Sequence, residues 1–344
     1  MSRYLLRRLR AVIIVLFGVT LITFTLMHFT AGSYVPGISG GRNIKPADVE
    51  RIKANLGLDR PVITQYADWI GVGWLLKSAG VAWVLPGNPV IDTGVLEGNF
   101  GRSLIDGAPV LDHVLDRLPN TIELTGTAML LGLLLSVPLG VFSALHRGSR
   151  IDRLLTALSV AGFSVPEFWL GLLLILLFSV SFRAWGLPNL PSTGATSAFA
   201  GGDLLDRIEH LAMPASVLAF FYFATWSRFV RSSMIEVLSQ DYIRTARSKG
   251  MPMARVLYVH ALRNGLTSLV TLIGLELPDL LSGSLVIEVV FSWPGIGLLA
   301  YQRALGYDYT TVMGITTFVA ILVVVGNLLA DLSYGILDPR VRYS

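Results

Sequence analysis

Three acidic side chains, Glu167, Glu276 and Asp279, occur inside long apolar stretches of the chain. A carboxylate is costly to hold within a membrane, so one that persists there is a functional candidate. Glu276 and Asp279 are three residues apart and share a helix face, with Pro278 between them loosening the backbone hydrogen bonds. Glu167 follows Pro166, where a kink would expose backbone carbonyls beside the carboxylate. These residues predict a hydrated polar path that can meet an ammonium group.

A different placement of the same acids stays open. Glu276 and Asp279 would then lie near the outer end of their segment and bond to solvent or to Arg303. A further acid, Glu288, precedes the pair Pro294-Gly295 and is expected in a structural turn at the outer surface.

A second group of candidates lies in the basic segment 231–263, which is much longer than a turn between antiparallel helices needs to be. The residues from Asp241 onward predict a short helix with Asp241 as its N-cap. Gly250 suits the left-handed position after the last turn, Lys249 suits the negative end of the helix dipole, and Pro252 prevents continuation. We expect this helix to lie parallel to the membrane surface.

The sides of this short helix differ in the residues they carry. Tyr242, Thr245, Ala246 and Lys249 fall at helical spacing on one side, and Ile243 and Arg247 fall on another. Small side chains would let a partner approach closely while charges surround the contact. A basic interfacial helix resting on anionic lipid is the alternative interpretation.

Several kinds of chemistry are absent from the sequence. The chain has no Cys, which excludes disulfides, thiolate metal sites and Cys nucleophiles. It has no G-x4-G-K-[ST] stretch, so ATP hydrolysis would have to come from another subunit. The lone His28 and His260 have no partner spacing that indicates a metal site, and structural roles are expected. We therefore expect neither an enzyme nor a cofactor or metal in this chain.

The elements that position these residues follow from composition. The chain has 344 residues, of which 53% are hydrophobic and 15% are charged, against about 25% charged in soluble domains. Apolar runs of membrane-crossing length recur, so an all-α polytopic membrane protein is expected. The net charge of +4 is too small and too dispersed for nucleic acid. Six spans are predicted, at about 11–29, 121–145, 154–185, 211–230, 266–291 and 311–337.

The loops between these segments set the orientation. Arg and Lys gather on the side of the N-terminus, which places both termini in the cytoplasm. Residues 1–30 hold the N-terminus and a retained first helix, since the apolar run is too long for a signal peptide and lacks a cleavage pattern. Residues 31–118 are expected to form a large extracytoplasmic region, 119–337 the transmembrane core, and 338–344 a cytoplasmic tail.

The short basic helix and several other stretches resemble a known family. The run Asp241 to Gly250, followed by His260-Ala-Leu-Arg-Asn264, is similar to the EAA loop of ABC importer permeases in its dipeptide and oligopeptide variant. The defined positions of the general pattern E-A-A-x3-G-x9-I-x-L-P are occupied in this chain by Arg244, Thr245, Ala246, Gly250, His260, Leu262 and Arg263. The Glu, one Ala, the Ile and the Pro of the general pattern are replaced, and these replacements resemble those found in the peptide subgroup. Other similar stretches are Tyr4-Leu-Leu-Arg-Arg8, Phe100-Gly-Arg-Ser103, Arg117-Leu-Pro-Asn-Thr121, Phe291-Ser-Trp-Pro-Gly-Ile-Gly297 and Leu337-Asp-Pro-Arg340.

This resemblance implies the type I ABC importer permease fold, in the cytoplasmic membrane of a bacterium or archaeon and in contact with lipid. The implied partners are a second, related permease subunit, two ABC ATPase subunits that bind ATP and Mg²⁺, and an extracytoplasmic solute-binding protein. The segment 231–263 becomes a cytoplasmic coupling loop whose helix fits a groove on an ATPase subunit. The residues assigned to that coupling helix are Asp241, Tyr242, Arg244, Thr245, Ala246, Arg247, Lys249 and Gly250.

The resemblance leaves the substrate open. The family handles mainly di- and oligopeptides, but similar permeases carry nickel complexes or oligosaccharides. A secondary transporter, which would be a different class of protein, should show paired inverted repeats with interrupted helices, and no convincing internal repeat is found. An intramembrane protease should show G-x-S-x with a membrane His, or G-x-G-D, and Ser282-Gly-Ser284 lacks that context.

Overall fold

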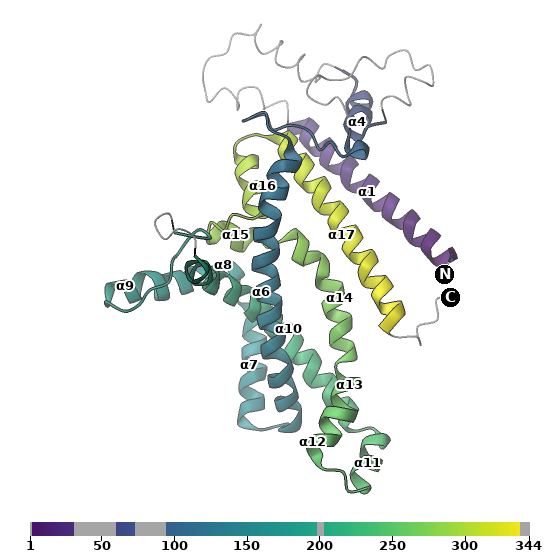
Figure 1. The fold of residues 1–344 in the computed structure, drawn as a ribbon, viewed down its shortest axis with the longest axis vertical. Coiled ribbons are helices and arrows are strands. Elements are labelled where there is room, and N and C mark those ends of the chain that lie inside the picture. The colour runs from purple at the N-terminus through teal and green to yellow at the C-terminus, as the bar shows by residue number, and fades with distance from the viewer. Residues whose placement is uncertain (1, 31–59, 73–93, 198–202, 338–344) are drawn as a thin grey trace. The chain divides into compact units, whose positions relative to one another are not determined.

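The computed structural model of the chain describes residues 2–30, 60–72, 94–197 and 203–337 (Figure 1). Within these ranges, the side chains of residues 2–9, 30, 268, 271, 277, 279, 281 and 329–337 lie outside the description. The chain divides into two compact units. Unit 1 comprises Met1–Pro119, Gly295–Leu328 and Arg342–Ser344, and unit 2 comprises Asn120–Pro294 and Leu329–Val341.

Unit 1 is built around two sets of contacts. Helix α4 packs on α1 through Trp69 and Phe24, whose ring centroids are 6.1 Å apart, and through a 2.9 Å hydrogen bond between Tyr66 and Thr20. A second cluster contains Phe100, Val110, Val114, Ile296, Leu299 and Ile315. The described elements of this unit are α1 (Ser2–Thr30), α4 (Val62–Ile70), the 3-10 turn η2 (Val95–Glu97), the first turns of α6 (Val110–Leu145), α16 (Ile296–Leu305) and most of α17 (Tyr309–Leu337).

Unit 2 holds both groups of predicted site residues. It contains the rest of α6, α7 (Arg150–Ser164), α8 (Glu167–Leu174), the π-helical stretch η3 (Ile175–Ser181), α9 (Phe182–Ala184) and α10 (Leu204–Leu238). It continues with α11 (Asp241–Ser248), α12 (Met253–Arg255), the π-helical stretch η4 (Val256–Ala261), α13 (Leu262–Gly265), α14 (Thr267–Ser282) and α15 (Leu285–Val290).

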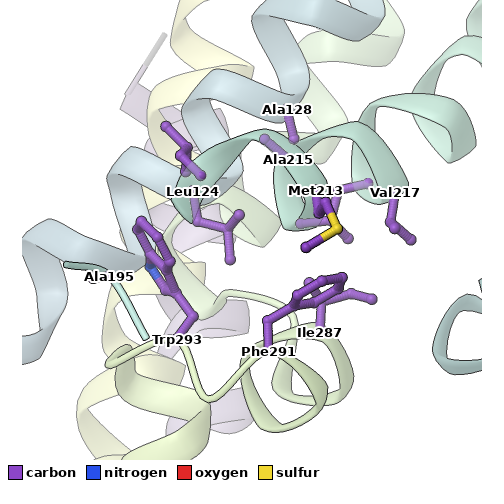
Figure 2. Packing of buried hydrophobic residues seen from close by; sticks show 11 residues of the cluster. Leu124, Ala128, Ala195, Met213, Ala215, Val217, Ile287, Phe291 and Trp293 are labelled. Carbon is purple, nitrogen blue, oxygen red and sulfur yellow. The ribbon is translucent and has the colours of Figure 1, made fainter. Parts of the chain in front are cut away.

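The core of unit 2 is formed where α6 and α10 meet the segment around α15. Figure 2 shows the rings of Trp293 and Phe291 lying across from Leu124, Met213 and Ala215. Trp293 Nε1 donates to the Asn120 carbonyl at 2.8 Å, so the indole is held at both its apolar body and its polar edge. This core holds together the helices that carry the acidic residues.

The predicted segment 154–185 is not a single helix, which corrects the sequence expectation. Helix α7 ends at Ser164 and α8 begins at Glu167. Val165 between them is extended, with φ −91° and ψ 127°, because a residue before proline avoids the helical conformation. Beyond this break, α8 runs in a different direction from α7 (Figure 1). A complete break therefore lies where the sequence predicts a kink.

The predicted segment 266–291 is also divided. Helix α14 ends at Ser282, Gly283 has a left-handed φ of 74°, and α15 begins two residues later. Among the described residues, five helices are long and apolar enough to cross a membrane. These are Arg10–Phe29, Val110–Leu145, Glu167–Ala184, Leu204–Leu238 and Tyr309–Leu328. The predicted span 266–291, which is divided between α14 and α15, is not among these five helices.

Candidate functional site

The helix α11 occupies the place where the sequence predicts a short basic helix. Its N-cap is Gln240, so the expectation that Asp241 is the N-cap is wrong. Asp241 is the first helical residue, where its carboxylate still lies at the positive end of the helix dipole. Gly250 has a φ of 76°, and its N–H donates to the Arg247 carbonyl at 2.9 Å. The predicted left-handed stop at Gly250 is thus confirmed.

Ile243 and Ala246 form the buried base of α11, with 0% and 7% of their surface exposed. They pack in a cluster with apolar residues of α6, α10, η4 and α14. The expectation that Ala246 faces a partner is therefore wrong, because the chain's own core covers it. The helix has only eight residues and few apolar ones, and these attach it to the core. The other buried members of the cluster are Met129, Val141, Ala144, Trp226, Val230, Met234, Val256, Ala261 and Leu269.

The remaining predicted residues of α11 lie on its exposed face. Arg244 Nη1 is 3.4 Å from Asp241 Oδ1, and both side chains are solvated, so this pair adds little stability. The Tyr242 hydroxyl accepts a hydrogen bond from Asn264 Nδ2 at 3.1 Å, which fixes the ring beside α13. The other exposed members are Thr245, Arg247 and Lys249. Cations outnumber acids on this face, so it suits an acidic protein groove or an anionic lipid surface.

A cavity of about 300 Å³ brings two of the three predicted carboxylates together. Glu167 enters it from the start of α8 and Glu276 from α14. Asp279 lies in α14 as well, but its side chain is outside the described part of the structure. The other lining residues are Thr125, Leu218, Phe221, Tyr222, Thr225, Gly283 and Ser284. The described lining includes no Arg or Lys, so its formal charge is negative.

Each glutamate in this cavity is held by a neighbouring side chain. Trp226 Nε1 donates to Glu276 Oε2 at 2.8 Å, and the indole stacks on Tyr222 with centroids 4.9 Å apart. Ser284 Oγ lies 3.5 Å from Glu167 Oε2, at the limit of a hydrogen bond. The alternative partner Arg303 instead donates to Asp106, at 2.8 Å. Both carboxylates are half-buried, so a cationic group in the cavity would meet them with reduced screening by water.

Glu288 has a structural role, as the sequence predicts, and its side chain is fully buried. The Thr121 hydroxyl donates to Glu288 Oε1 at 3.0 Å, which ties α15 to α6. The Trp293 N–H donates to the Glu288 carbonyl at 2.8 Å and closes the turn that follows.

The sequence reasoning missed Asp152, a buried carboxylate at the start of α7. Hydrogen bonds from Arg231 hold its pKa well below the ordinary range, against the opposing effect of burial, with help from Ser143 and the Gly148 N–H. A local signal was available, because Ser149 is three residues before Asp152. The Ser149 hydroxyl caps α7 by accepting from the Asp152 N–H at 3.1 Å.

A second polar centre that was missed lies in unit 1 around Asp308. This carboxylate is fully buried and accepts from Ser103 Oγ at 2.6 Å and from Thr311 Oγ1 at 2.7 Å. Arg303 links it to Asp106. Burial raises the pKa of Asp106, but hydrogen bonds led by the one from Arg303 outweigh burial and hold the pKa well below its usual range. Ser103 and Asp106 lie some 200 residues from Asp308 and Arg303 in sequence, so no local pattern predicts these contacts.

Comparison with known proteins gives consistent matches over the whole chain. The family model for the binding-protein-dependent transport system inner membrane component matches residues 136–343, and the model for the N-terminal part of such membrane components matches residues 1–125. The oligopeptide transport system permease protein AppB of Bacillus subtilis (strain 168) is 38% identical over 344 residues, covering 100% of both chains. The dipeptide transport system permease protein DppB of Escherichia coli (strain K12) is 37% identical over 359 residues, covering 100% of this chain and 99% of that one.

A solved structure shares the fold. An inward-facing conformation of the MetNI methionine ABC transporter aligns with a TM-score of 0.51 at 20% identity. The alignment covers 66% of this chain and 96% of that chain. At this identity the likeness shows the fold alone.

Proposed function

Because the chain belongs to the family of binding-protein-dependent transport system inner membrane components, we propose that it is the permease subunit through which an ATP-driven importer takes up di- and oligopeptides. Proteins of this family are non-catalytic, multi-pass transmembrane subunits of ABC systems, and the expected ABC importer permease fold is confirmed. ATP binding in such systems belongs to partner ATPases, and a binding protein is a further partner. The names of the full-length relatives support a peptide as the substrate.

The observation that carries this proposal is the construction of α11. Its buried base of Ile243 and Ala246 attaches it to the core, while its cationic face is left in solvent. A short helix fixed in this way transmits a displacement that a flexible loop would absorb. In the proposal α11 is the coupling helix, and an ATPase subunit contacts Asp241, Tyr242, Arg244, Thr245, Arg247 and Lys249. Ala246 and Gly250 act from within the chain, as the base and the stop of the helix.

The acidic cavity is the proposed section of the translocation path. Glu167 and Glu276 face a common space of about 300 Å³, and Asp279 belongs to the same proposal because it shares a helix with Glu276. A peptide brings a free ammonium group, which the two carboxylates attract in a partly dry site. The aromatic rings of Phe221 and Tyr222 offer an apolar surface to the peptide side chains.

The proposed assembly contains a second, homologous permease, because one chain supplies half of a pathway. Two ABC ATPase subunits, which carry the ATP and Mg²⁺, lie against the coupling helices. A solute-binding protein docks on the extracytoplasmic region 31–118. The chain would then lie in the cytoplasmic membrane of a bacterium or archaeon, with both termini in the cytoplasm, as the distribution of Arg and Lys suggests.

Native co-purification tests this proposal. The chain is tagged, extracted gently from its own membranes, and its stoichiometric partners are identified by mass spectrometry. We expect two P-loop ATPases, a second permease and a binding protein. The double variant Arg244→Glu, Arg247→Glu should lose the ATPases and keep the second permease. Its matched control, Arg150→Glu with Arg153→Glu on the exposed side of α7, should keep both.

The remaining outcomes separate the alternatives. A chain that purifies alone, or only with itself, would overturn the importer assignment and favour a secondary transporter. A binding protein that carries a nickel complex or an oligosaccharide would keep the importer and overturn the peptide assignment.

A further inference from the structure

The ion pair between Asp152 and Arg231 joins helices next to α11. Asp152 lies in the first turn of α7 and is 4% exposed. Arg231 Nε donates to Oδ1 at 2.7 Å and Nη2 donates to Oδ2 at 3.0 Å, so the guanidinium binds both carboxylate oxygens. The Ser143 hydroxyl and the Gly148 N–H also donate to this carboxylate, the latter at 2.8 Å. One carboxylate therefore fastens the end of α6, the following turn and α7 to α10.

Helices α7 and α10 stay in close contact beyond this pair. The hydroxyl oxygens of Ser159 and Ser227 are 3.0 Å apart and buried. Gly162 lies so near Ala224 that a Cβ built on the glycine would be 2.4 Å from the alanine Cβ. The contact positions rise along α7 as they fall along α10, so the helices are antiparallel. We call the pairs Asp152–Arg231, Ser159–Ser227 and Gly162–Ala224 the α7–α10 seam.

The C-terminal end of α10 leads directly to α11. Arg231 lies between Val230 and Met234, which are fully buried in the same cluster as Ile243 and Ala246. Only Ser239 and Gln240 separate α10 from α11. A displacement of α11 must therefore move the turn of α10 that carries Arg231.

The far end of α7 leads directly to the cavity. Helix α7 ends at Ser164, and only Val165 and Pro166 separate it from Glu167, which lines the cavity. A rotation of α7 therefore changes how Glu167 enters the cavity. The seam connects this carboxylate to α11 through packed side chains within one compact unit.

We propose that Asp152 and Arg231 are positioning residues whose bidentate pair makes α7 move with α10 and α11, so that displacement of the coupling helix reaches Glu167. This inference rests on the proposed function of α11. An ion pair suits the task because the planar guanidinium and the carboxylate fix both distance and orientation, which an apolar contact does not. The hydrogen bonds from Arg231 also lower the pKa of Asp152, so the carboxylate stays charged at neutral pH.

The test measures coupling rather than stability. The complete transporter is reconstituted in liposomes with its ATPases and binding protein, and peptide uptake is divided by ATP hydrolysed. Asp152→Asn and Arg231→Gln should lower this ratio about fivefold or more, which is the lower range of a typical coupling between sites. Arg231→Lys keeps the charge without the bidentate geometry and should restore part of the ratio. Arg153→Gln, an exposed neighbour on α7, is the matched control and should leave the ratio unchanged.

A disulfide across the seam gives a second, independent test. The chain has no Cys, so Ser159→Cys with Ser227→Cys introduces the chain's only thiol pair. The serine oxygens are already 3.0 Å apart, so a disulfide should form on oxidation with little movement of the backbone. Because α7 and α10 move together in this proposal, the oxidised transporter should keep its uptake. In the Asp152→Asn background, oxidation should restore the coupling ratio and reduction should remove it again.

The outcomes distinguish the seam from the importer assignment. A normal coupling ratio in Asp152→Asn, or loss of uptake on oxidation of the cysteine pair, would overturn the positioning role alone. If Asp152→Asn does not assemble, the cysteine pair in the otherwise unchanged chain still tests whether α7 and α10 move together. A wild-type complex without any ATP-driven uptake would instead overturn the proposed function.

Discussion

The helix α11 carries exposed cations over a small buried apolar base, whereas the cavity holds carboxylates among aromatic and aliphatic walls. The charges of α11 are exposed to solvent, but Glu276 in the cavity is fixed by the Trp226 indole. The contrast shows how one compact unit can serve two purposes. A surface that must meet another protein needs a rigid attachment and solvated charges, while a surface that must pass a solute needs oriented charges in a partly dry space.

The largest expected effect comes from breaking the attachment of α11. Ala246→Glu puts a carboxylate into the cluster that holds Ile243, and an uncompensated buried charge costs roughly 3–5 kcal/mol. We expect α11 to detach and uptake to be lost. The measurement is thermal unfolding of the purified chain together with uptake in membrane vesicles.

The neighbouring residue supplies the control for this attachment. Thr245→Glu changes the exposed face instead of the base, so the unfolding temperature should stay within about 2 °C of wild type, as expected for a surface substitution. Equal unfolding of both variants would contradict the division of α11 into a buried base and an exposed face.

The next effect concerns the cavity. Glu276→Gln removes the charge but keeps an oxygen for the Trp226 N–H. Peptide uptake should fall about tenfold, corresponding to about 1.4 kcal/mol, while ATPase subunits still co-purify. Glu209→Gln, an exposed glutamate of α10 outside the cavity lining, is the matched control. Unchanged uptake in Glu276→Gln would remove the case for this cavity as part of the path.

A smaller effect is expected at the stop of α11. Gly250 has a φ of 76°, and nothing lies within 4 Å of a Cβ built on it, so Gly250→Ala is unfavourable for conformational reasons alone. The expected cost is about 1 kcal/mol. Gly126→Ala, in open space on α6, is the control and should be neutral or slightly stabilising. Differential scanning calorimetry of both variants checks this, and an equal effect of the two substitutions would argue against a strained stop.

The last effect, from titration of Asp152, is confined to acid pH. Its folded pKa lies below the ordinary value of 3.8, so at acid pH the unfolded chain binds more protons than the folded one. The stabilisation is therefore complete at neutral pH and is lost as the pH falls through about 3.8 toward the folded pKa. Unfolding midpoints of wild type and Asp152→Asn, measured from pH 6 downward, should converge in acid. Parallel curves would exclude a stabilising carboxylate at this position.

Local signals explain what could be predicted of α11. Gly250 and Pro252 act on the backbone beside them, so the end of the helix can be predicted from the sequence. Ala246 is buried in one cluster with Val256 and Ala261 of η4, a segment that joins the cluster only after the chain has turned back at Gly250. Sequence spacing gives the faces of a short helix but not which face meets the core.

The cavity shows the same limit over a longer distance. Glu167 and Glu276 each stand out as acids in apolar runs, but only the packing of α8 and α14 around α10 brings them to one space. The break at Pro166 was foreseen as a kink, and its completeness follows from Val165 taking an extended conformation. Asp152 had a capping signal in Ser149, whereas its partner Arg231 lies 79 residues away.

The most direct measurement is site-specific cross-linking from α11 in the assembled transporter. Because the chain has no Cys, Arg244→Cys or Arg247→Cys gives it a single attachment point for a short photo-activated cross-linker. We predict an adduct with the P-loop ATPase from both positions, and none from the exposed control position in Arg183→Cys on α9. Adducts with lipid alone from positions 244 and 247 would contradict the coupling role and leave α11 as a basic helix on the membrane surface.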